Sequence, residues 1–489
     1  MTKLKQFFTN LKNEELNIKL LILFAFISGF FLGSGIMTDY DVWFHYRAGE
    51  YFMLNGEVPK VAIGSWYGIN SGLQWISHEW LFGVIIYWII ETFGIVGVSF
   101  FVPMMIGTVV ATMTFLFRDV FKENYLLGFI GILLVSFILS MGKSPRPHLI
   151  AYLLTVILFY IMRKDSEEDS KILYTLPILT ILWVNFHGGS YIMIHIFLLI
   201  NTIIHLFDFR LGKIVFEKQD WKRTKRRLLI MLLCICVIPL NGHGFDMVLY
   251  PFTNFQDALM QSTISEWASP DLKLSPHYKI YLMMALGIWA MIATRKDIKA
   301  VDFCTYFIYL VLTSRSSRFA AQLCVVGIPI MLHYTDSIDG WFRLTKDKLI
   351  TILLTSVGSM FLIMSIVCFV DAIKQPFTSW SLPSEDVVEV MHETNPERLL
   401  NDYNIGGFLL YEHIDVFIDG RADIYTKYNY SDYLEMSNFK GKAVELLDEY
   451  DFDYILIKKV RPLNTYLEVC DDYEKLAEDD NHAYYKVLK

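Results

Sequence analysis

The sequence has little charge, few cysteines and no phosphate-binding loop. Charged residues make up 19% of the 489 residues, while 54% are hydrophobic and 16% are aromatic, a composition far from that of a soluble protein. The six cysteines show no metal-type spacing, so they indicate neither a disulfide framework nor a zinc site. No GxGxxG or Walker pattern joins a predicted strand to a helix, which argues against a nucleotide-binding fold.

Apolar residues are concentrated in eleven stretches, which we predict to be transmembrane helices. Several are shorter than the ~20 residues that a straight helix needs to cross the hydrocarbon, so we expect their ends to extend into flanking polar residues. The first stretch follows lysines but has no small-residue cleavage site, and we interpret it as a retained helix. The stretches are 20–36, 92–117, 125–141, 148–162, 172–186, 190–207, 228–240, 278–294, 300–313, 319–335 and 349–370.

The basic residues between these stretches test the assignment independently. With a cytoplasmic N-terminus, the inner segments carry 23 Lys and Arg and the short outer segments carry 7. The positive-inside rule therefore predicts a multi-pass protein of the cell membrane with a cytoplasmic N-terminus and an extracytoplasmic C-terminus. We interpret the densest basic block as a topological anchor in contact with lipid headgroups, not as a nucleic-acid patch. It consists of Lys222, Arg223, Lys225, Arg226 and Arg227.

The composition changes beyond residue 370. Residues 371–489 hold 25 Asp and Glu against 12 Lys and Arg, which predicts a separate soluble domain. Alternating elements favour a small α/β sandwich, with strands near 398–401, 416–419, 454–457, 473–477 and 483–488 and helices near 407–412, 430–436, 442–450 and 463–470. The predicted fold class is thus an α-helical polytopic membrane domain over 1–370, with a first outer loop at 37–91, followed by an extracytoplasmic α/β domain over 371–489.

Ionisable residues gather on the predicted outer loops. The first loop carries an Asp-x-Asp motif, Asp39 and Asp41, which can bind a divalent cation, orient a phosphate or supply a general base; solvated acids or a helix cap are the plainer alternative. Its residues 78–91 predict a helix in the membrane interface, and we interpret Trp66, Trp75 and Trp80 as interfacial anchors, not sugar platforms. The other candidates on this loop are His45, Arg47, His78 and Glu79.

Later outer loops add Arg146, His148, His187, Glu266, Arg315 and Arg318. Each has a structural alternative: the arginines could be anchors at helix ends, the His187 segment a tight turn with two glycines, and Glu266 a solvated acid. Ionisable groups next to a membrane are costly unless they are used. Arginine suits phosphate oxygens and histidine exchanges protons near neutral pH, so their convergence predicts a site for a phosphate-bearing lipid.

Six motifs together resemble a group of bacterial and archaeal polytopic membrane proteins placed with the GT-C superfamily of glycosyltransferases. They are DYDVWFHYRAGEYFMLNGEVP from residue 39, HEWL at 78–81, RPHL at 146–149, NFHGG at 185–189, ISEW at 264–267 and FIDGRADIY at 417–425. The resemblance implies transfer of a sugar, usually with inversion, from a polyprenyl-phosphate-linked donor to a glycan, lipid or protein acceptor at the outer face. The C-terminal part has no Trp-Trp-Asp motif, so we do not expect an oligosaccharyltransferase that acts on Asn.

The resemblance also implies roles for the candidate residues. Asp41 would be the general base and Asp39 its partner, or the two would hold a cation such as Mg or Mn near the donor phosphate. Arg146, Arg315 and Arg318 would hold that phosphate, and His78, His187 and Glu266 would orient the acceptor or complete a metal site. His45, Arg47, Glu79 and His148 complete the predicted substrate-binding residues.

Two other functions fit parts of the sequence. A transporter or flippase for a lipid-linked or anionic solute usually has internal repeats and polar residues in the middle of its spans, and neither is apparent here. A structural scaffold would not need His and Arg on so many outer loops. In the C-terminal part, Asp402, Asp419, Arg421 and Asp423 are expected near strand ends, where α/β domains often bind ligands; the alternative is a buried Arg–Asp pair that stabilises a turn.

Overall fold

A computed structural model describes residues 2–254, 267–274, 277–335, 346–374 and 382–488. Its contacts divide the chain into two units, each assembled from separate parts of the sequence. Unit 1 comprises Met1–Gly35, Ser99–Ile238 and Ile264–Asp371, and unit 2 comprises Ile36–Val98, Pro239–Thr263 and Ala372–Lys489. The first predicted loop therefore groups with the C-terminal residues, whereas the proposed domain boundary at residue 370 stays a prediction.

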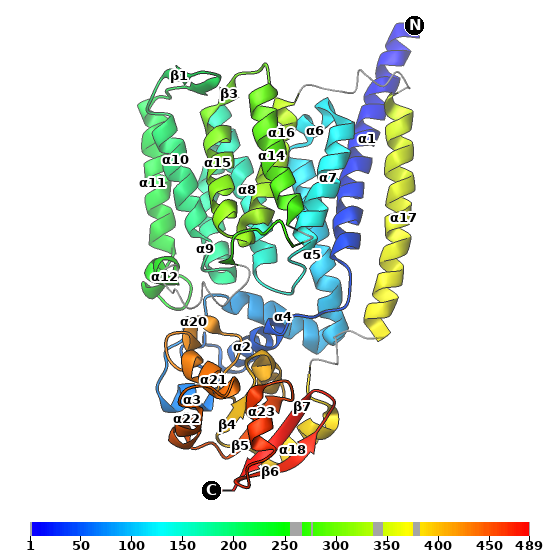
Figure 1. Ribbon diagram of the computed structural model, residues 1–489. Coiled ribbons are helices and arrows are strands. Elements are labelled where there is room, and N and C mark those ends of the chain that lie inside the picture. The colour runs from blue at the N-terminus through cyan, green and yellow to red at the C-terminus, as the bar shows by residue number, and fades with distance from the viewer. Residues whose placement is uncertain (1, 255–266, 275–276, 336–345, 375–381, 489) are drawn as a thin grey trace. The chain divides into compact units, whose positions relative to one another are not determined.

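All eleven apolar stretches contain helices, as predicted. Three are long and apolar enough to cross a membrane by themselves, Glu15–Gly33, Ile95–Leu116 and Ile350–Lys374, and the number of crossings stays a prediction. The helices (Figure 1) are α1 (Thr2–Gly33), α5 (Ile95–Leu116), α7 (Tyr125–Ser140), α8 (His148–Glu167), α9 (Leu176–Phe186), α10 (Ile192–Ile204), α11 (Trp221–Val237), α14 (Tyr278–Ala293), α15 (Ala300–Arg315), α16 (Ala320–Tyr334) and α17 (Lys346–Lys374).

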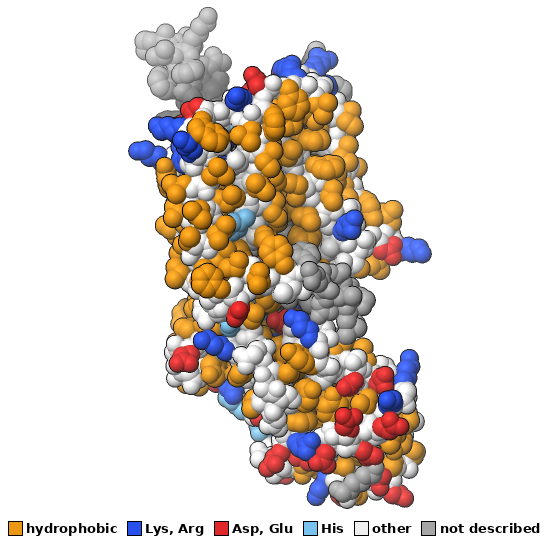
Figure 2. Space-filling model, turned by 90° about the vertical axis from the view of Figure 1, so that its left-hand side faces the viewer, with side chains coloured by type: hydrophobic (Ala, Val, Ile, Leu, Met, Phe, Trp, Pro, Cys, Tyr) orange, Lys and Arg blue, Asp and Glu red, His pale blue; other side chains and the backbone are white. Residues whose placement is uncertain are grey.

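The surface of this helical bundle is strongly apolar. On the face shown in Figure 2, hydrophobic side chains cover most of the bundle. Large apolar side chains stay exposed along whole helices, including Leu228, Leu229, Leu232 and Leu233 of α11. A water-soluble protein rarely exposes contiguous apolar surface of this extent, so the bundle belongs to a membrane protein.

A small sheet connects the loops at one end of the bundle. Strand β1 (Phe209–Leu211) pairs antiparallel with β2 (Ile214–Phe216), and β2 pairs parallel with β3 (Ile298–Lys299). Gly212 forms the tight hairpin turn with a φ of 60°, a conformation that glycine adopts without strain. The sheet ties the segment between α10 and α11 to the start of α15.

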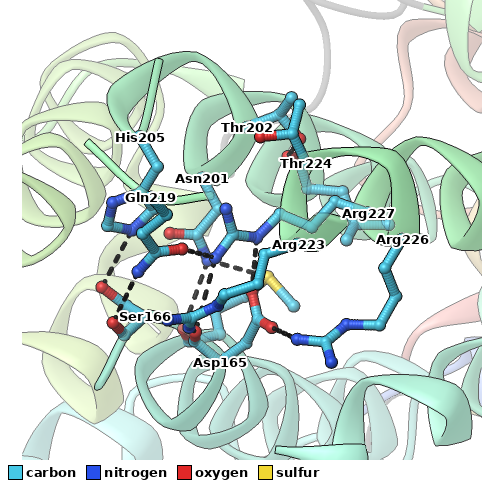
Figure 3. A network of polar contacts seen from close by, with 12 residues as sticks. Asp165, Ser166, Asn201, Thr202, His205, Gln219, Arg223, Thr224, Arg226 and Arg227 are labelled. Carbon is cyan, nitrogen blue, oxygen red and sulfur yellow. Dashed lines mark hydrogen bonds and ion pairs between the residues drawn. The ribbon is translucent and has the colours of Figure 1, made fainter. Parts of the chain in front are cut away.

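The arginines of α11 bind residues of α8 (Figure 3), unlike the headgroup contact expected for them. Asp165 is fully buried and accepts hydrogen bonds from Arg226, at 3.0 Å, and from Arg227. Arg223 donates to the backbone carbonyls of Asp165 and Glu168 at the end of α8, where the helix dipole favours positive charge. The predicted anchor is therefore in part an internal clamp, and of the basic block only Lys222 and Lys225 are exposed.

Unit 2 is built around a four-stranded sheet with the order β4-β5-β7-β6. Strands β4 (Leu399–Asn401) and β5 (Tyr454–Lys458) are parallel, and β7 (His482–Val487) is antiparallel to both β5 and β6 (Tyr473–Glu478). The predictions of these four strands are confirmed. So are the predicted helices α19 (Gly406–Tyr411), α21 (Tyr430–Ser437), α22 (Ala443–Tyr450) and α23 (Pro462–Leu467), while α18 (Glu385–Thr394) and α20 (Ala422–Tyr425) were not predicted.

The predicted strand at 416–419 is wrong. Apart from one isolated parallel bridge between Val416 and Ser65, the backbone there is held by a side chain. The amide of Asn401 accepts from the N–H groups of Phe417 and Ile418 and donates to the carbonyl of Ile418. Because Asn401 ends β4, the segment lies beside the sheet without extending it. The residues after it consequently form a loop and the short helix α20 instead of following a strand.

The first loop contributes to the core of unit 2. It forms α2 (Asp41–Asn55), α3 (Trp66–Asn70) and α4 (Trp80–Phe93). Trp66 and Trp75 are buried in one apolar cluster with Phe417 and Ile455, and the Trp66 indole donates to the carbonyl of Leu399 at 2.9 Å. The interpretation of these two tryptophans as interfacial anchors is therefore wrong. A loop that shares its core with the C-terminal sheet is structurally part of that unit.

Candidate active site in unit 2

The Asp-x-Asp motif begins helix α2, and its two acids have different roles. Asp39 accepts a hydrogen bond from the backbone N–H of Asp41 at 2.9 Å, which supports the interpretation of Asp39 as a cap. Asp41 lies in the first turn of α2, where free N–H groups and the helix dipole favour a carboxylate. The motif thus places one carboxylate in the first turn of α2 and uses the other to hold the backbone at the helix start.

The loop of the DGRAD motif, residues 419–423, approaches Asp41 closely. A β-carbon added to Gly420 would lie 2.5 Å from Oδ1 of Asp41 and 3.4 Å from its Cγ, which is shorter than a normal van der Waals contact. A side chain at residue 420 would therefore have to displace the carboxylate of Asp41. Glycine therefore brings two distant motifs of the sequence into contact.

A close crossing of α2 and α4 places His45 next to Glu79. A β-carbon on Gly49 would lie 2.1 Å from the carbonyl oxygen of Gly83, and one on Gly83 would lie 2.6 Å from that of His45. At this crossing the buried His45 imidazole lies edge-on to Phe82, with ring centroids 5.0 Å apart. Its Nε2 is 3.7 Å from Oε2 of Glu79, the residue that precedes α4.

His78 is the centre of a second group of contacts. Its Nε2 lies 3.2 Å from Oε1 of Glu79, and its Nδ1 lies 2.7 Å from the hydroxyl of Tyr250, in α12 (Asp246–Asn254). The same hydroxyl donates to Oδ2 of Asp423 at 3.2 Å. Since a tyrosine has one hydroxyl proton, Tyr250 accepts from Nδ1–H of His78 while it donates to Asp423, and Glu79 accepts from Nε2–H.

The surroundings of His78 favour its protonated form. Burial would lower the pKa of His78, but the charge and hydrogen bond of Glu79 and the charge of Asp423 raise the pKa above its ordinary value. Burial raises the pKa of Asp423. The charge of His78 lowers this pKa, and the charge of Glu79 raises it further. Burial, together with the charge of His78, lowers the pKa of His243 to about 4. The cluster therefore holds groups that can exchange protons near neutral pH.

Asp419 and Arg421 form a buried pair that shapes the DGRAD loop. Nε of Arg421 donates to Oδ1 of Asp419 at 2.8 Å, and the hydroxyl of Tyr425 donates to Oδ2 of Asp419, also at 2.8 Å. The guanidinium lies over the Trp75 ring, 4.8 Å from its centroid. This is the buried Arg–Asp pair considered as the structural alternative for this segment. It fixes the loop that carries Gly420 and Asp423.

These residues form a ring of neighbours, in which Asp41 and His45 are related by helix geometry and the others by contacts. Asp41 and His45 are one turn apart on α2, so their side chains lie on the same face of the helix. His45 meets Glu79, Glu79 meets His78, and His78 meets Asp423. Asp423 belongs to the same loop as Gly420, which contacts Asp41. Residues from the first loop, α12 and the C-terminal segment thus form one acid–imidazole cluster within unit 2.

Arg47, a predicted substrate-binding residue on α2, does not join this ring. It forms an ion pair with Glu50 one turn along the helix. Glu50 in turn lies 3.7 Å from Nε2 of His413. Of the first-loop candidates, Asp41, His45, His78 and Glu79 are brought together, whereas Asp39 caps the helix and Arg47 is engaged elsewhere.

The remaining described candidates lie in unit 1. Nε2 of His148 is 2.9 Å from the carbonyl oxygen of Gly142, and Nδ1 of the buried His187 is 2.7 Å from the hydroxyl of Ser190. Arg318 lies over the Trp267 ring, 5.2 Å from its centroid. Arg146 precedes α8, Arg315 is the last residue of α15, and Glu266 lies outside the described residues. Convergence of these residues with Asp41 in a single pocket stays a prediction.

No group of three or more His, Cys, Asp or Glu in the described part of the chain is arranged to hold a metal ion. A divalent cation at Asp39 and Asp41 stays a prediction.

Sequence reasoning missed Tyr250, which is buried and bridges His78 and Asp423. A neutral tyrosine in the apolar run DMVLYPF has no local feature that marks it, because its role depends on partners far away in the sequence.

No family model and no curated protein matches this sequence, but solved structures do. One is the oligosaccharyltransferase of Archaeoglobus fulgidus with a tethered acceptor peptide containing the NVT sequon, with a TM-score of 0.58, 10% identity and coverage of 91% of this chain and 69% of that chain. The chain shares the fold of this structure. Another is AglB of the same organism with an inhibitory peptide and a dolichol-phosphate, with a TM-score of 0.56 and the same identity and coverages.

The shared fold supports the resemblance to GT-C proteins expected from the six motifs. It is matched over nine-tenths of the chain by proteins that share one residue in ten with it, so the likeness concerns the architecture and carries over no individual residue. What this chain does at its own acid–imidazole cluster has to be argued from that cluster.

Proposed function

We propose that this protein is a membrane glycosyltransferase that moves a sugar from a polyprenyl-phosphate-linked donor to an acceptor hydroxyl at the outer membrane face. The observation that carries the proposal is the position of Asp41. Its carboxylate begins a helix, touches the DGRAD loop at Gly420 and lies one turn from His45. A GT-C fold around a carboxylate of this kind supports transfer chemistry, as does the dolichol-phosphate bound by one structure of the same fold.

In the proposed reaction Asp41 is the general base. It takes the proton of the acceptor hydroxyl while the acceptor oxygen attacks the anomeric carbon of the donor. The bond between that carbon and the phosphate oxygen breaks, and the polyprenyl phosphate leaves with the electron pair. Attack from the side opposite the phosphate inverts the anomeric configuration. Such a reaction depends on positioning, on charge stabilisation and on one base.

The cationic residues of unit 1 would stabilise the leaving phosphate in this scheme. Arg146 precedes α8, Arg315 ends α15 and Arg318 lies in the short turn before α16. Their guanidinium groups would reach a headgroup while the aliphatic parts stay in apolar surroundings. His187 and His148 would contact the sugar or the acceptor. Should a cation such as Mg or Mn bind, Asp39 and Asp41 would hold it, and it would neutralise the same phosphate.

The acceptor is proposed to differ from that of the archaeal structure. That protein was solved with an acceptor peptide containing the NVT sequon. Because this sequence has no Trp-Trp-Asp motif, we propose that the acceptor offers a hydroxyl, as a glycan, a lipid or a Ser or Thr side chain does. A base such as Asp41 is suited to such a hydroxyl.

The test is a transfer assay with purified protein in nanodiscs, using a panel of radiolabelled polyprenyl-phosphate sugars. Asp41→Asn should lower kcat by about 100-fold or more, the size of effect typical for a lost general base. Glu57→Gln, at an exposed acid of the same loop, is the matched control and should transfer normally. Equal activity of Asp41→Asn and wild type removes Asp41 as the base, and movement of unreacted donor across the bilayer supports a flippase instead.

A further inference from the structure

Helix α11 exposes one face along most of its length. Trp221, Lys225 and Leu228 lie on this face at intervals of about one turn, and Leu232 and Ile235 continue the row. All of these side chains are exposed, with Trp221 60% and Leu232 56% exposed. Residues three and four positions apart lie on the same side of a helix. This side therefore begins with an aromatic and a basic residue and continues as an apolar row.

A second exposed row runs beside the first. It begins at Lys222 and continues through Leu229, Leu233 and Cys236. Figure 2 looks onto the side of the bundle where α11 lies in Figure 1; basic side chains gather at one end of the bundle, and hydrophobic side chains cover most of the rest. Each row thus joins one lysine near the start of α11 to apolar side chains further along, as a membrane lipid joins a polar headgroup to apolar chains.

The arginines of α11 bind inside unit 1 and hold the helix against α8 (Figure 3). Arg226 and Arg227 share Asp165, Arg226 also pairs with Asp169, and Arg223 donates to backbone carbonyls of α8. Nε of Arg226 and Nη1 of Arg227 are buried and have no hydrogen-bond partner among the described residues. Two carboxylates therefore face three guanidinium groups. The clamp fixes the exposed face of α11 in place and leaves this end of the helix positive.

The two lysines of α11 have no acidic partner in the part of the chain that the structure describes. The ammonium of Lys225 lies 5.9 Å from the centroid of the Trp221 ring, a cation–π contact that leaves its N–H donors available. The first turn of α11 contains no acid, and Asp220 before it accepts the backbone N–H of Arg223 at 2.8 Å as the helix cap. Lys222 and Lys225 are thus unpaired cations at the point where the apolar rows begin.

We propose that the exposed face of α11 binds a phospholipid whose headgroup carries a net negative charge. The lipid phosphate contacts Lys222 and Lys225, the Trp221 indole lies at the level of the headgroup, and the acyl chains follow the two apolar rows. A negative headgroup is favoured over a zwitterionic one because the cations of α11 outnumber the acids that face them. The site belongs to unit 1 and does not depend on the proposed function.

The apolar rows distinguish a phospholipid from other anions. A nucleic acid, an acidic protein or free phosphate could contact the lysines but would leave the leucines beside them uncovered. Exposed leucines in contiguous rows require an apolar environment, so the two lysines lie at a lipid boundary. Two rows also match the two acyl chains of a phospholipid better than the single chain of a polyprenyl carrier.

The exposed Trp221 supplies the measurement. The protein is placed in phosphatidylcholine nanodiscs that contain a small fraction of lipid brominated near the headgroup, which quenches nearby indoles, and the Trp221 signal is the difference between wild type and Trp221→Phe. Brominated phosphatidylglycerol should quench this signal at a mole fraction about tenfold lower than brominated phosphatidylcholine, since each lysine near an anionic headgroup strengthens binding about fivefold.

The double variant Lys222→Gln with Lys225→Gln tests the two cations directly. It should lose the preference for phosphatidylglycerol and keep the quenching by brominated phosphatidylcholine, because the apolar rows stay intact. Lys122→Gln with Lys143→Gln removes two exposed lysines that flank α7 and is the matched control, with the preference of the wild type. Phosphatidylglycerol should also raise the unfolding midpoint of the wild type but not of the α11 variant, because a ligand of the folded state stabilises it.

Three results would overturn the proposal. Equal quenching by the two brominated lipids would mean an unselective lipid annulus around α11. A preference that survives in the α11 double variant would mean that other cations hold the headgroup. Displacement of brominated phosphatidylglycerol by a polyprenyl phosphate at lower mole fraction than by unlabelled phosphatidylglycerol would assign the face to the carrier lipid instead.

Discussion

Gly420 lies so close to Asp41 that a β-carbon at position 420 would be 2.5 Å from the carboxylate oxygen of Asp41. The two residues are almost 380 positions apart in the sequence. Their contact joins the Asp-x-Asp motif to the DGRAD motif and makes the orientation of the proposed base depend on a backbone that carries no side chain at this point.

The first prediction concerns this contact. Gly420→Ala should displace the Asp41 side chain, because the clash is with its terminal oxygen and not with backbone. We expect at least a tenfold loss of kcat in the transfer assay, as small misplacements of a reacting group are costly. Gly358→Ala in α17, where an added β-carbon meets only an ordinary contact at 3.6 Å, should keep its activity. An active Gly420→Ala would show that Asp41 does not need this orientation.

The crossing of α2 and α4 gives a prediction about stability. Gly49→Ala would put a β-carbon 2.1 Å from the carbonyl oxygen of Gly83, and the two helices would have to separate. Overpacking of this type costs about 1–3 kcal/mol, so the midpoint of thermal unfolding in detergent should fall clearly. For comparison, Gly142→Ala meets no atom closer than 3.5 Å and should unfold like the wild type.

The helices of the bundle could be predicted from sequence because each apolar stretch carries its own helical tendency, and hydropathy needs no knowledge of distant residues. The prediction of a strand at 416–419 is wrong because the conformation there depends on distant residues. The apolar residues of this segment fit a strand locally, but the side chain of Asn401 takes the hydrogen bonds that a strand ladder would use. Only the pairing of two distant segments decides between these conformations.

The candidate site likewise has a part that local sequence predicts and a part that depends on distant residues. His78 and Glu79 are adjacent in the sequence, and Asp41 and His45 share one helical face, so part of the cluster could be predicted from spacing alone. The roles of Gly420, Tyr250 and Asp423 could not, because they depend on the fold of unit 2. Trp66 and Trp75 were misplaced because an aromatic residue in a loop beside a membrane span has the same sequence pattern whether it faces lipid or a core.

His243 gives a prediction for the pH dependence of stability. Its pKa falls to about 4 because of burial and the neighbouring His78, so the unfolded chain binds a proton at this residue more tightly than the folded one. Stability linked to His243 is therefore present above about pH 6.5 and is lost as pH falls from about 6.5 to about 4. His243→Gln should flatten the fall of the unfolding midpoint over this range.

The titration of His78 changes the stability in the opposite direction to that of His243, so His78 supplies the control. Its raised pKa means that the folded state binds the proton more tightly, so the stability it contributes is present at low pH and is lost as pH rises through the folded pKa. Because this change lies above the ordinary histidine pKa of about 6.5, His78→Gln should remove a loss of stability on the alkaline side and leave the acid-side fall that His243→Gln flattens. Identical pH curves for the two variants would contradict the assigned shifts.

The last prediction concerns the clamp between α8 and α11. Asp165 is the buried acceptor for both Arg226 and Arg227, and the Arg227 side chain is fully buried. Asp165→Asn removes the negative charge while leaving two arginines in place, and breaking a buried pair from one side costs about 3–5 kcal/mol. The variant should unfold at a markedly lower temperature. Asp169, which also pairs with Arg226, has a side chain that is 59% exposed, so Asp169→Asn should cost about 1 kcal/mol or less. Equal unfolding temperatures for these two variants would mean that the arginines of α11 are satisfied by the backbone carbonyls at the end of α8 and not by the charge of Asp165.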